Sequence, residues 1–329
     1  MSLLAVRGLR TVFAAGQREL VAVDDVSFSV AEREVLAVVG ESGSGKSVTA
    51  LSIMGLLPQP GARVAAGTVH FDGRDLLTLE ERAMRRIRGK GIGMVFQEPM
   101  TALHPLFTIG NQLMETIRAH ERLSVRATRE RAIDMLGRVG IDAAGRRFDD
   151  YPHQLSGGMR QRVMIAIALA CHPRLLIADE PTTALDVTIQ SQILDLLLSL
   201  RDELGMALII VTHNMGVVAE IADRALVMYA GRIVEEAAVE DLFDRPAHPY
   251  TRGLLASMPT LDDARRRLQA IPGLPPDPSS LPPGCRFAPR CAWQVAVCAS
   301  AGTGPALVAA SAAAGHRAAC LRLDAVAAS

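Results

Sequence analysis

One octapeptide near the start of the chain constrains its fold more than any other feature. Residues 40–47 read Gly-Glu-Ser-Gly-Ser-Gly-Lys-Ser, which matches the phosphate-binding pattern G-x-x-x-x-G-K-[ST] in full. The apolar run Val35–Val39 precedes it and predicts a buried strand, while Lys46–Leu57 follows it and predicts a helix that Pro58 ends. The sequence therefore predicts a strand, a glycine-rich loop and a helix whose N-terminus faces a phosphate group.

Each residue type in this loop has a chemical reason. Glycines let backbone N–H groups turn inward at little cost, Lys46 can reach the outer phosphates, and the Ser47 hydroxyl can hold Mg²⁺. A turn that only joins a strand to a helix would need neither the lysine nor the serine. We therefore predict that one continuous stretch binds the nucleotide: Gly40, Glu41, Ser42, Gly43, Ser44, Gly45, Lys46, Ser47 and Val48.

Two carboxylates at the end of a second apolar run extend this prediction. Leu175–Ala178 predicts a buried strand, and Asp179 and Glu180 follow it directly. Acids at such a position need a partner, and the carboxyl ends of parallel strands are where ligands bind. We expect Asp179 to bind Mg²⁺, and Glu180 to polarise the water that attacks the γ-phosphate.

Strand and helix patterns alternate along most of the chain. Ile92–Phe96 and Leu208–Val211 predict further buried strands, and residues 98–170 are rich in helical pattern. This alternation predicts an α/β fold with a mostly parallel sheet between helices. The first 30 residues instead alternate apolar and polar side chains, which favours an antiparallel sheet with one wet face.

Composition excludes several classes of protein. The 329 residues carry 35 basic and 35 acidic side chains, so the chain has no basic excess with which to bind nucleic acid. Only two of the basic residues are lysines, Lys46 and Lys90, and one of them stands in the phosphate loop. No run approaches the roughly 18 apolar residues of a membrane span, and no secretory signal is evident, so we expect a cytoplasmic chain.

A second glycine motif separates the candidate classes of nucleotide-binding protein. A phosphate loop alone leaves kinases, GTPases, helicases and transport ATPases open. Ser156, Gly157 and Gly158, in the stretch Leu-Ser-Gly-Gly-Met-Arg-Gln-Arg, form another candidate anion site: a helix cap with exposed N–H groups. Two such loops on one chain suggest that each completes the nucleotide pocket of a partner subunit.

Here the chain resembles the ATP-binding-cassette (ABC) superfamily, whose signature is LSGGQ, with Met159 in place of the glutamine. The resemblance implies a P-loop NTPase with a RecA-like core, an antiparallel β subdomain and a helical subdomain over about 98–170. It also implies roles for Gln97 and His213 at the γ-phosphate, with Gln97 also near Mg²⁺. Asp186, in Ala184-Leu185-Asp186, would face the partner subunit, and Phe13 would stack on adenine.

The C-terminal part narrows the resemblance to one branch. His248-Pro249-Tyr250-Thr251 is similar to the segment that opens the C-terminal extension in ATPases of dipeptide, oligopeptide and nickel importers. We therefore expect an ABC ATPase domain over 1–245 and an extension over 246–329 that includes a proline-rich linker. The branch implies ATP-driven peptide import, a related ATPase as heterodimer partner, two separate permease subunits and an extracytoplasmic solute-binding protein. The ATPase would lie peripherally on the cytoplasmic face of the membrane.

Other functions stay open at this stage. The same subunit could serve nickel or another small solute. A non-transport ABC ATPase acting on DNA or ribosomes is a second alternative, although the insertions and fused cassettes typical of that class are absent from the sequence. A nucleotide-binding regulator without turnover is a third, and Glu180 together with His213 argues against it.

Four of the five cysteines fall within a short C-terminal stretch: Cys285, Cys291, Cys298 and Cys320. Their spacing matches neither the common zinc patterns nor the common ferredoxin patterns. Clustered thiols in a reducing compartment favour a metal or a cluster over disulfides. The resemblance implies a [4Fe–4S] cluster, and zinc and free thiols remain the alternatives.

Overall fold

The computed structural model describes residues 2–16, 18–183, 185–258, 270–300, 302, 304–310 and 315–327. The chain forms two compact units. The first, which we call the helical unit, comprises residues 31–34 and 78–211. The second, which we call the phosphate-loop unit, comprises the described parts of 2–30, 35–77 and 212–329. The phosphate-loop unit therefore also contains the described residues that follow residue 245.

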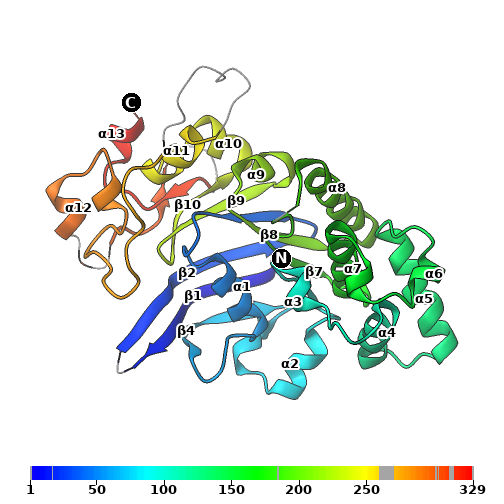
Figure 1. Ribbon diagram of the computed structural model, residues 1–329. Helices are drawn as coiled ribbons and strands as arrows, with labels where there is room; N and C mark the ends of the chain where they lie inside the picture. The colour runs from blue at the N-terminus through cyan, green and yellow to red at the C-terminus, as the bar shows by residue number, and fades with distance from the viewer. Residues whose placement is uncertain are drawn as a thin grey trace. The chain divides into compact units, whose positions relative to one another are not determined.

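An antiparallel sheet forms the N-terminal part of the phosphate-loop unit (Figure 1). Its strands lie in the order β2-β1-β4-β5, with the bounds β1 (Ser2–Ala15), β2 (Arg18–Ala31), β4 (Ala62–Phe71) and β5 (Arg74–Asp75). Val26, Phe28 and Val30 are buried in β2 while the residues between them are exposed. This alternation is the one expected from the sequence, because successive side chains of a strand point to opposite faces.

A second group of strands in this unit carries the phosphate loop. β3 (Val35–Val39) is buried throughout and runs parallel to β9 (Arg224–Tyr229). β10 (Arg232–Ala238) pairs antiparallel with β9, and the short C-terminal strands β12 (Arg317–Ala318) and β11 (Val308–Ala309) continue the order. The C-terminal part of the chain thus adds strands to the sheet that positions the loop.

Short helices complete the phosphate-loop unit. Helix α1 (Lys46–Met54) starts directly after the loop and ends at Gly55 in a left-handed conformation, a little before the end predicted from the prolines. The others are α9 (Met215–Ile221), α10 (Val239–Asp244), α11 (Pro249–Ala256), α12 (Ala296–Ser300), α13 (Leu323–Ala327) and the 3₁₀ turns η1 (Leu76–Thr78), whose last residue belongs to the helical unit, and η4 (Ala288–Arg290). The proline-rich residues 270–287 contain neither helix nor strand.

The helical unit contains a parallel set of strands and most of the helices. The strand order is β8-β7-β6, with β6 (Ile92–Val95), β7 (Leu175–Asp179) and β8 (Ala207–Thr212). Parallel pairing places Ile92 beside Leu175 and Leu175 beside Ala207. All three strands are buried, as predicted from their continuous apolar runs.

Helices α4, α5, α6 and α7 pack together in the helical unit, as Figure 1 shows. The unit's helical segments are α2 (Glu81–Ile87), α3 (Pro99–Ala102), α4 (Ile109–His120), α5 (Val125–Arg138), α6 (Ala144–Arg147), η2 (Pro152–Gln154), α7 (Gly157–Leu169) and α8 (Val187–Leu204). The side chains of Thr108, Ser124, Ser156 and Asp186 cap four of these helices by accepting a backbone N–H. In the described part of the chain, no helix is long and apolar enough to cross a membrane.

Candidate functional site

The phosphate loop has the backbone that the octapeptide predicts. Gly45 caps α1 with φ of +101°, and a Cβ atom at this position would lie 2.6 Å from the Ala22 carbonyl oxygen. Gly43 also has a positive φ, of +79°, but a Cβ there would meet nothing within 4 Å. Close packing against Ala22 therefore requires glycine at position 45, whereas the space beside Gly43 is empty. An open loop at a helix N-terminus is suited to an anion.

Lys46 lies at the centre of this loop. It is 4% exposed, and its Nζ donates to the carbonyl oxygens of Gly40, at 2.7 Å, and Glu41, at 3.0 Å. The hydroxyl of Ser44 is buried and has no hydrogen-bond partner among the residues that the structure describes. A buried cation and a buried unpaired hydroxyl beside open backbone are groups that a phosphate would satisfy.

The remaining predicted nucleotide residues of this unit lie in the loop, at the start of α1, on β1 and after β8. Ser42 is exposed, and Ser47 and Val48 are partly buried at the start of α1. Phe13 is partly buried on β1. Thr11 of the same strand is hydrogen-bonded to Ser52 of α1 at 2.8 Å. His213 directly follows β8 and is exposed.

In the helical unit, the structure brings Gln97 and Glu180 together from two different strands. Gln97 is the second residue after the end of β6 and donates from Nε2 to Oε2 of Glu180 at 3.3 Å. Thr183 donates to the same Glu180 oxygen at 2.8 Å. Asp179, the last residue of β7, is 5% exposed, whereas Glu180 is partly exposed with φ of +46°. The pair of acids is therefore one buried carboxylate and one accessible carboxylate with a fixed orientation.

The second anion motif is a capped helix start. Ser156 accepts the Met159 N–H at 3.3 Å, and both Ser156 and Gly157 are exposed at the first turn of α7, while Gly158 is partly buried. Asp186 caps α8 by accepting the Ile189 N–H at 2.9 Å and is also exposed. Ala184 lies outside the described residues. Both motifs therefore present polar groups at an accessible surface of the helical unit.

The four C-terminal cysteines line one small cavity of about 10 Å³, room for about one water molecule. All four are free thiols, and burial raises the pKa of Cys285, Cys320 and Cys291, the last to about 11. The identity of the donors suits a cluster or zinc. However, no group of three or more His, Cys, Asp or Glu side chains within the described ranges is arranged to hold a metal ion.

Comparisons with known proteins decide the family. The family description "ABC transporter" matches residues 23–183, and "Oligopeptide/dipeptide transporter, C-terminal region" matches residues 234–298. A peptide import ATP-binding protein, so named, of Brucella melitensis is 57% identical over 310 residues, which cover 91% of this chain and 92% of the relative. This chain belongs to the ABC transporter family. A similarly named protein of Brucella abortus is 55% identical over 296 residues, with 90% and 89% covered.

Solved ABC proteins share the fold. The dimeric ATP-binding cassette MJ0796 in a post-hydrolysis state with ADP and Pi gives a TM-score of 0.64 at 32% identity. The match covers 72% of this chain and 98% of that one. The protein cbiO1 of Clostridium perfringens, part of an ABC transporter complex, gives 0.63 at 28% identity, with 74% and 91% covered. The predicted family, the α/β P-loop fold and the ATPase class are thereby confirmed. The division at residue 245 and the individual site residues stay predictions.

Sequence reasoning missed how the ABC ATPase holds its phosphate loop from the C-terminal side. Arg290 donates to both carboxylate oxygens of Glu41, at 2.6 and 3.0 Å, and Tyr250 accepts the Glu41 N–H at 2.7 Å. The hydrogen bonds to Glu41 raise the pKa of Arg290, and burial raises the pKa of Tyr250. Tyr250 was visible in the His-Pro-Tyr-Thr motif, but no spacing rule links residue 41 to residue 290.

A second missed group is centred on Asp24, in β2. Arg10 and Arg232 donate to its carboxylate at 3.0 and 2.7 Å, and Arg286 of the C-terminal part also donates to it. Burial alone would raise the pKa of Asp24, but the hydrogen bond and charge of Arg232, with the charges of Arg286 and Arg10, lower it below the usual value. The sequence does not predict this group, because an acid distant in the chain gives no local signal.

Proposed function

We propose that this chain binds and hydrolyses ATP to drive peptide import through permease subunits carried on other chains. The observation that carries the proposal is the joint match: an ABC region with a complete phosphate loop, a C-terminal region of the oligopeptide/dipeptide type, and relatives above 50% identity that are named for peptide import. The ABC region alone would leave the cargo open, and the C-terminal region is what points to peptides. Nickel or another small solute is the alternative cargo.

ATP would lie against the phosphate loop. Lys46 would leave the Gly40 and Glu41 carbonyls for the β- and γ-phosphates, and the backbone N–H groups from Gly43 onward would bind phosphate oxygens. Phe13 would stack on adenine. Ser47, Gln97 and Asp179 would hold Mg²⁺, which neutralises phosphate charge during the reaction.

Glu180 would orient the attacking water. Its carboxylate is partly exposed, and Gln97 and Thr183 both donate to one of its oxygens, which fixes the orientation of the side chain. Positioning of this kind, with general-base assistance, typically contributes 10²–10⁴-fold to a rate. His213 would contact the γ-phosphate and so report whether it is present.

A second ATPase subunit would complete each site. Ser156, Gly157 and Gly158, at the accessible start of α7, would face the phosphates bound by the partner's loop, with Asp186 at the same interface. The proposed assembly contains a related ATPase as heterodimer partner, two permeases and a solute-binding protein. In it, the chain is peripheral on the cytoplasmic face of the membrane.

We also propose that the four clustered cysteines bind a [4Fe–4S] cluster, with zinc and free thiols as alternatives. Their common cavity supports a shared ligand, but its volume of about 10 Å³ means that the side chains must move outward to admit a cluster. Iron and acid-labile sulfide in protein purified without oxygen would support the cluster. Stoichiometric zinc, or neither metal, would overturn it.

The function is tested by reconstituting the ATPase in vesicles with the permeases and the solute-binding protein that are encoded by neighbouring genes. ATP enclosed in the vesicles should drive uptake of labelled di- or oligopeptides. Glu180→Gln should lower the rate of ATP hydrolysis by about 10²–10⁴-fold while ATP binding persists. Undiminished turnover in Glu180→Gln would refute the role of Glu180. Nickel uptake without peptide uptake would refute the cargo.

A further inference from the structure

We propose that Arg290 is a positioning residue for the nucleotide site: by neutralising and fixing Glu41, it makes ATP affinity depend on the C-terminal segment, by which we mean the described residues after 245. The inference rests on the proposed nucleotide binding and adds a residue and a mode of control to it. Arg290 belongs to the 3₁₀ turn Ala288–Arg290, far in sequence from the loop, yet in the same compact unit.

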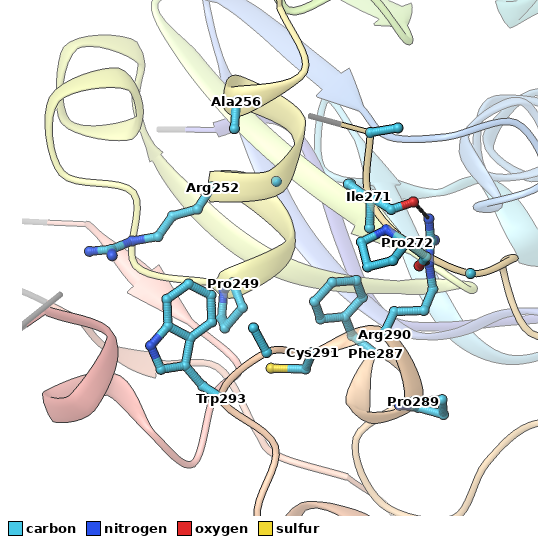
Figure 2. A pocket seen from close by; sticks show the side chains of 14 residues that line it. Pro249, Arg252, Ala256, Ile271, Pro272, Phe287, Pro289, Arg290, Cys291 and Trp293 are labelled. Carbon is cyan, nitrogen blue, oxygen red and sulfur yellow. Dashed lines mark hydrogen bonds between the residues drawn. The ribbon is translucent and has the colours of Figure 1, made fainter. Parts of the chain in front are cut away.

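The Arg290 side chain is fully engaged. Besides its two bonds to Glu41, it donates to the carbonyl oxygen of Pro272 at 2.9 Å and to the Tyr229 hydroxyl at 3.3 Å. Its side chain is 4% exposed. Figure 2 shows it beside Ile271 and Pro272 at the edge of a pocket of about 520 Å³. A guanidinium held on several sides has one orientation, so its fork to the Glu41 carboxylate is specific.

Glu41 is held through its backbone as well. Its N–H donates to Tyr250, which is 0% exposed and packs against Tyr229 and Phe287 with ring centroids 4.6 and 5.4 Å away. The same aromatic group lies under the Arg290 guanidinium, about 6 Å from the Tyr229 and Phe287 rings. Two elements of the C-terminal segment, α11 and the turn Ala288–Arg290, therefore fix one residue of the loop.

That residue is connected directly to the phosphate-binding groups. The Glu41 carbonyl oxygen accepts from Lys46 Nζ at 3.0 Å and from the Ser44 N–H at 3.2 Å. A shift of Glu41 would therefore alter the positions of Lys46 and Ser44. The Glu41 carboxylate adds a negative charge to a loop that must bind a polyanion, and Arg290 neutralises it.

The turn that carries Arg290 also lies between two of the clustered cysteines. Cys285 and Cys291 precede and follow it, and Cys291 is directed toward Pro249 and Trp293 in Figure 2. The cysteine-lined cavity and the phosphate loop are thus joined by a few residues of continuous chain. Changes at the cysteines have a short structural route to Glu41.

The experiment measures binding of AMP-PNP to the full chain by calorimetry, together with hydrogen exchange of peptides that cover residues 40–48. Arg290→Gln should raise the Kd roughly tenfold, about 1.4 kcal/mol, and speed exchange in the loop. Arg290→Lys keeps the charge but loses the two parallel hydrogen bonds to Glu41, so its Kd should lie between those of the unmodified chain and Arg290→Gln. The double variant Arg290→Gln with Glu41→Gln should bind more tightly than Arg290→Gln alone, because the unpaired charge is gone.

Arg317→Gln is the control, because Arg317 also lies in the C-terminal segment but pairs with Glu236 of β10. Its Kd should stay within about twofold of the unmodified chain. A Kd unchanged in Arg290→Gln, or no rescue by the Glu41 change, would overturn the positioning role. Failure of the unmodified chain to bind AMP-PNP would instead overturn the proposed function, and loop exchange would still decide whether Arg290 fixes Glu41.

Discussion

The buried carboxylate of Glu235 allows a stability effect to be worked out bond by bond. Its side chain is 0% exposed in β10. One oxygen accepts from the Ala247 N–H at 2.7 Å and from His316 Nε2 at 2.8 Å, and the other accepts from the His248 N–H at 2.8 Å. This one side chain therefore binds the segment after β10 and the segment near β12.

Glu235→Gln keeps the shape but replaces one acceptor with an amide donor. The amide oxygen can take the place of the oxygen that accepts two bonds, and the NH₂ group then faces the His248 N–H. A charge-assisted hydrogen bond contributes about 1.5–3 kcal/mol, and a buried unsatisfied N–H costs about 1–3 kcal/mol. We expect the free energy of unfolding to fall by about 3–5 kcal/mol, which corresponds to roughly 4–7 °C in Tm for a chain of 329 residues.

The assay is guanidinium unfolding followed by tryptophan fluorescence. Trp293 is the only tryptophan in the chain and lies in the C-terminal segment, so its signal reports on the part that Glu235 holds. Glu240→Gln, an exposed acid in α10, is the matched control and should cost about 1 kcal/mol or less. If Glu235→Gln unfolds within 1 kcal/mol of the unmodified chain, the reasoning from its three donors is wrong.

Two further predictions concern the same unit. Asp24→Asn leaves Arg232 and Arg286 facing a neutral group, so the free energy of unfolding at pH 7 should fall by about 3–5 kcal/mol. Because the folded-state pKa of Asp24 is lowered, its contribution is present above the unfolded value of 3.8 and is lost as pH falls through the folded value. Acid unfolding curves of Asp24→Asn should lack this loss, and parallel curves in both proteins would contradict the assignment. Gly45→Ala adds a Cβ 2.6 Å from the Ala22 carbonyl at φ of +101° and should weaken AMP-PNP binding at least tenfold by calorimetry. Gly16→Ala, also at positive φ but with nothing within 4 Å, should leave binding within twofold, and equal effects would refute steric crowding as the cause.

Local patterns were sufficient for most of the fold. Val35–Val39, Leu175–Asp179 and Ala207–Thr212 are strands because a continuous apolar run of this length suits burial on both faces. The start of α1 at Lys46 followed from the loop motif itself. The predicted end of this helix, at Leu57, lies beyond the observed end before Gly55. A glycine in the left-handed conformation ends a helix as effectively as the prolines that follow it.

The candidate residues of the nucleotide site could also be named from the sequence, because they stand at fixed short spacings. Lys46 and Ser47 follow the glycines directly, and Asp179 and Glu180 follow their strand directly. Which strand ends lie together has no local signal: Gln97 and Glu180 meet only because β6 and β7 are neighbours in register. Parallel neighbours bring their carboxyl ends to the same edge, so order in the sheet decides which side chains can cooperate.

The sequence by itself thus determined the phosphate loop, the family and the strands that carry the acids. Only the tertiary structure decided what surrounds Glu41. Arg290 and Tyr250 reach it because β12 adds to β10 and the C-terminal segment folds back onto the loop. A motif records residues that must be adjacent in the chain, whereas an ion pair between residues 41 and 290 depends on long-range packing that leaves no local pattern.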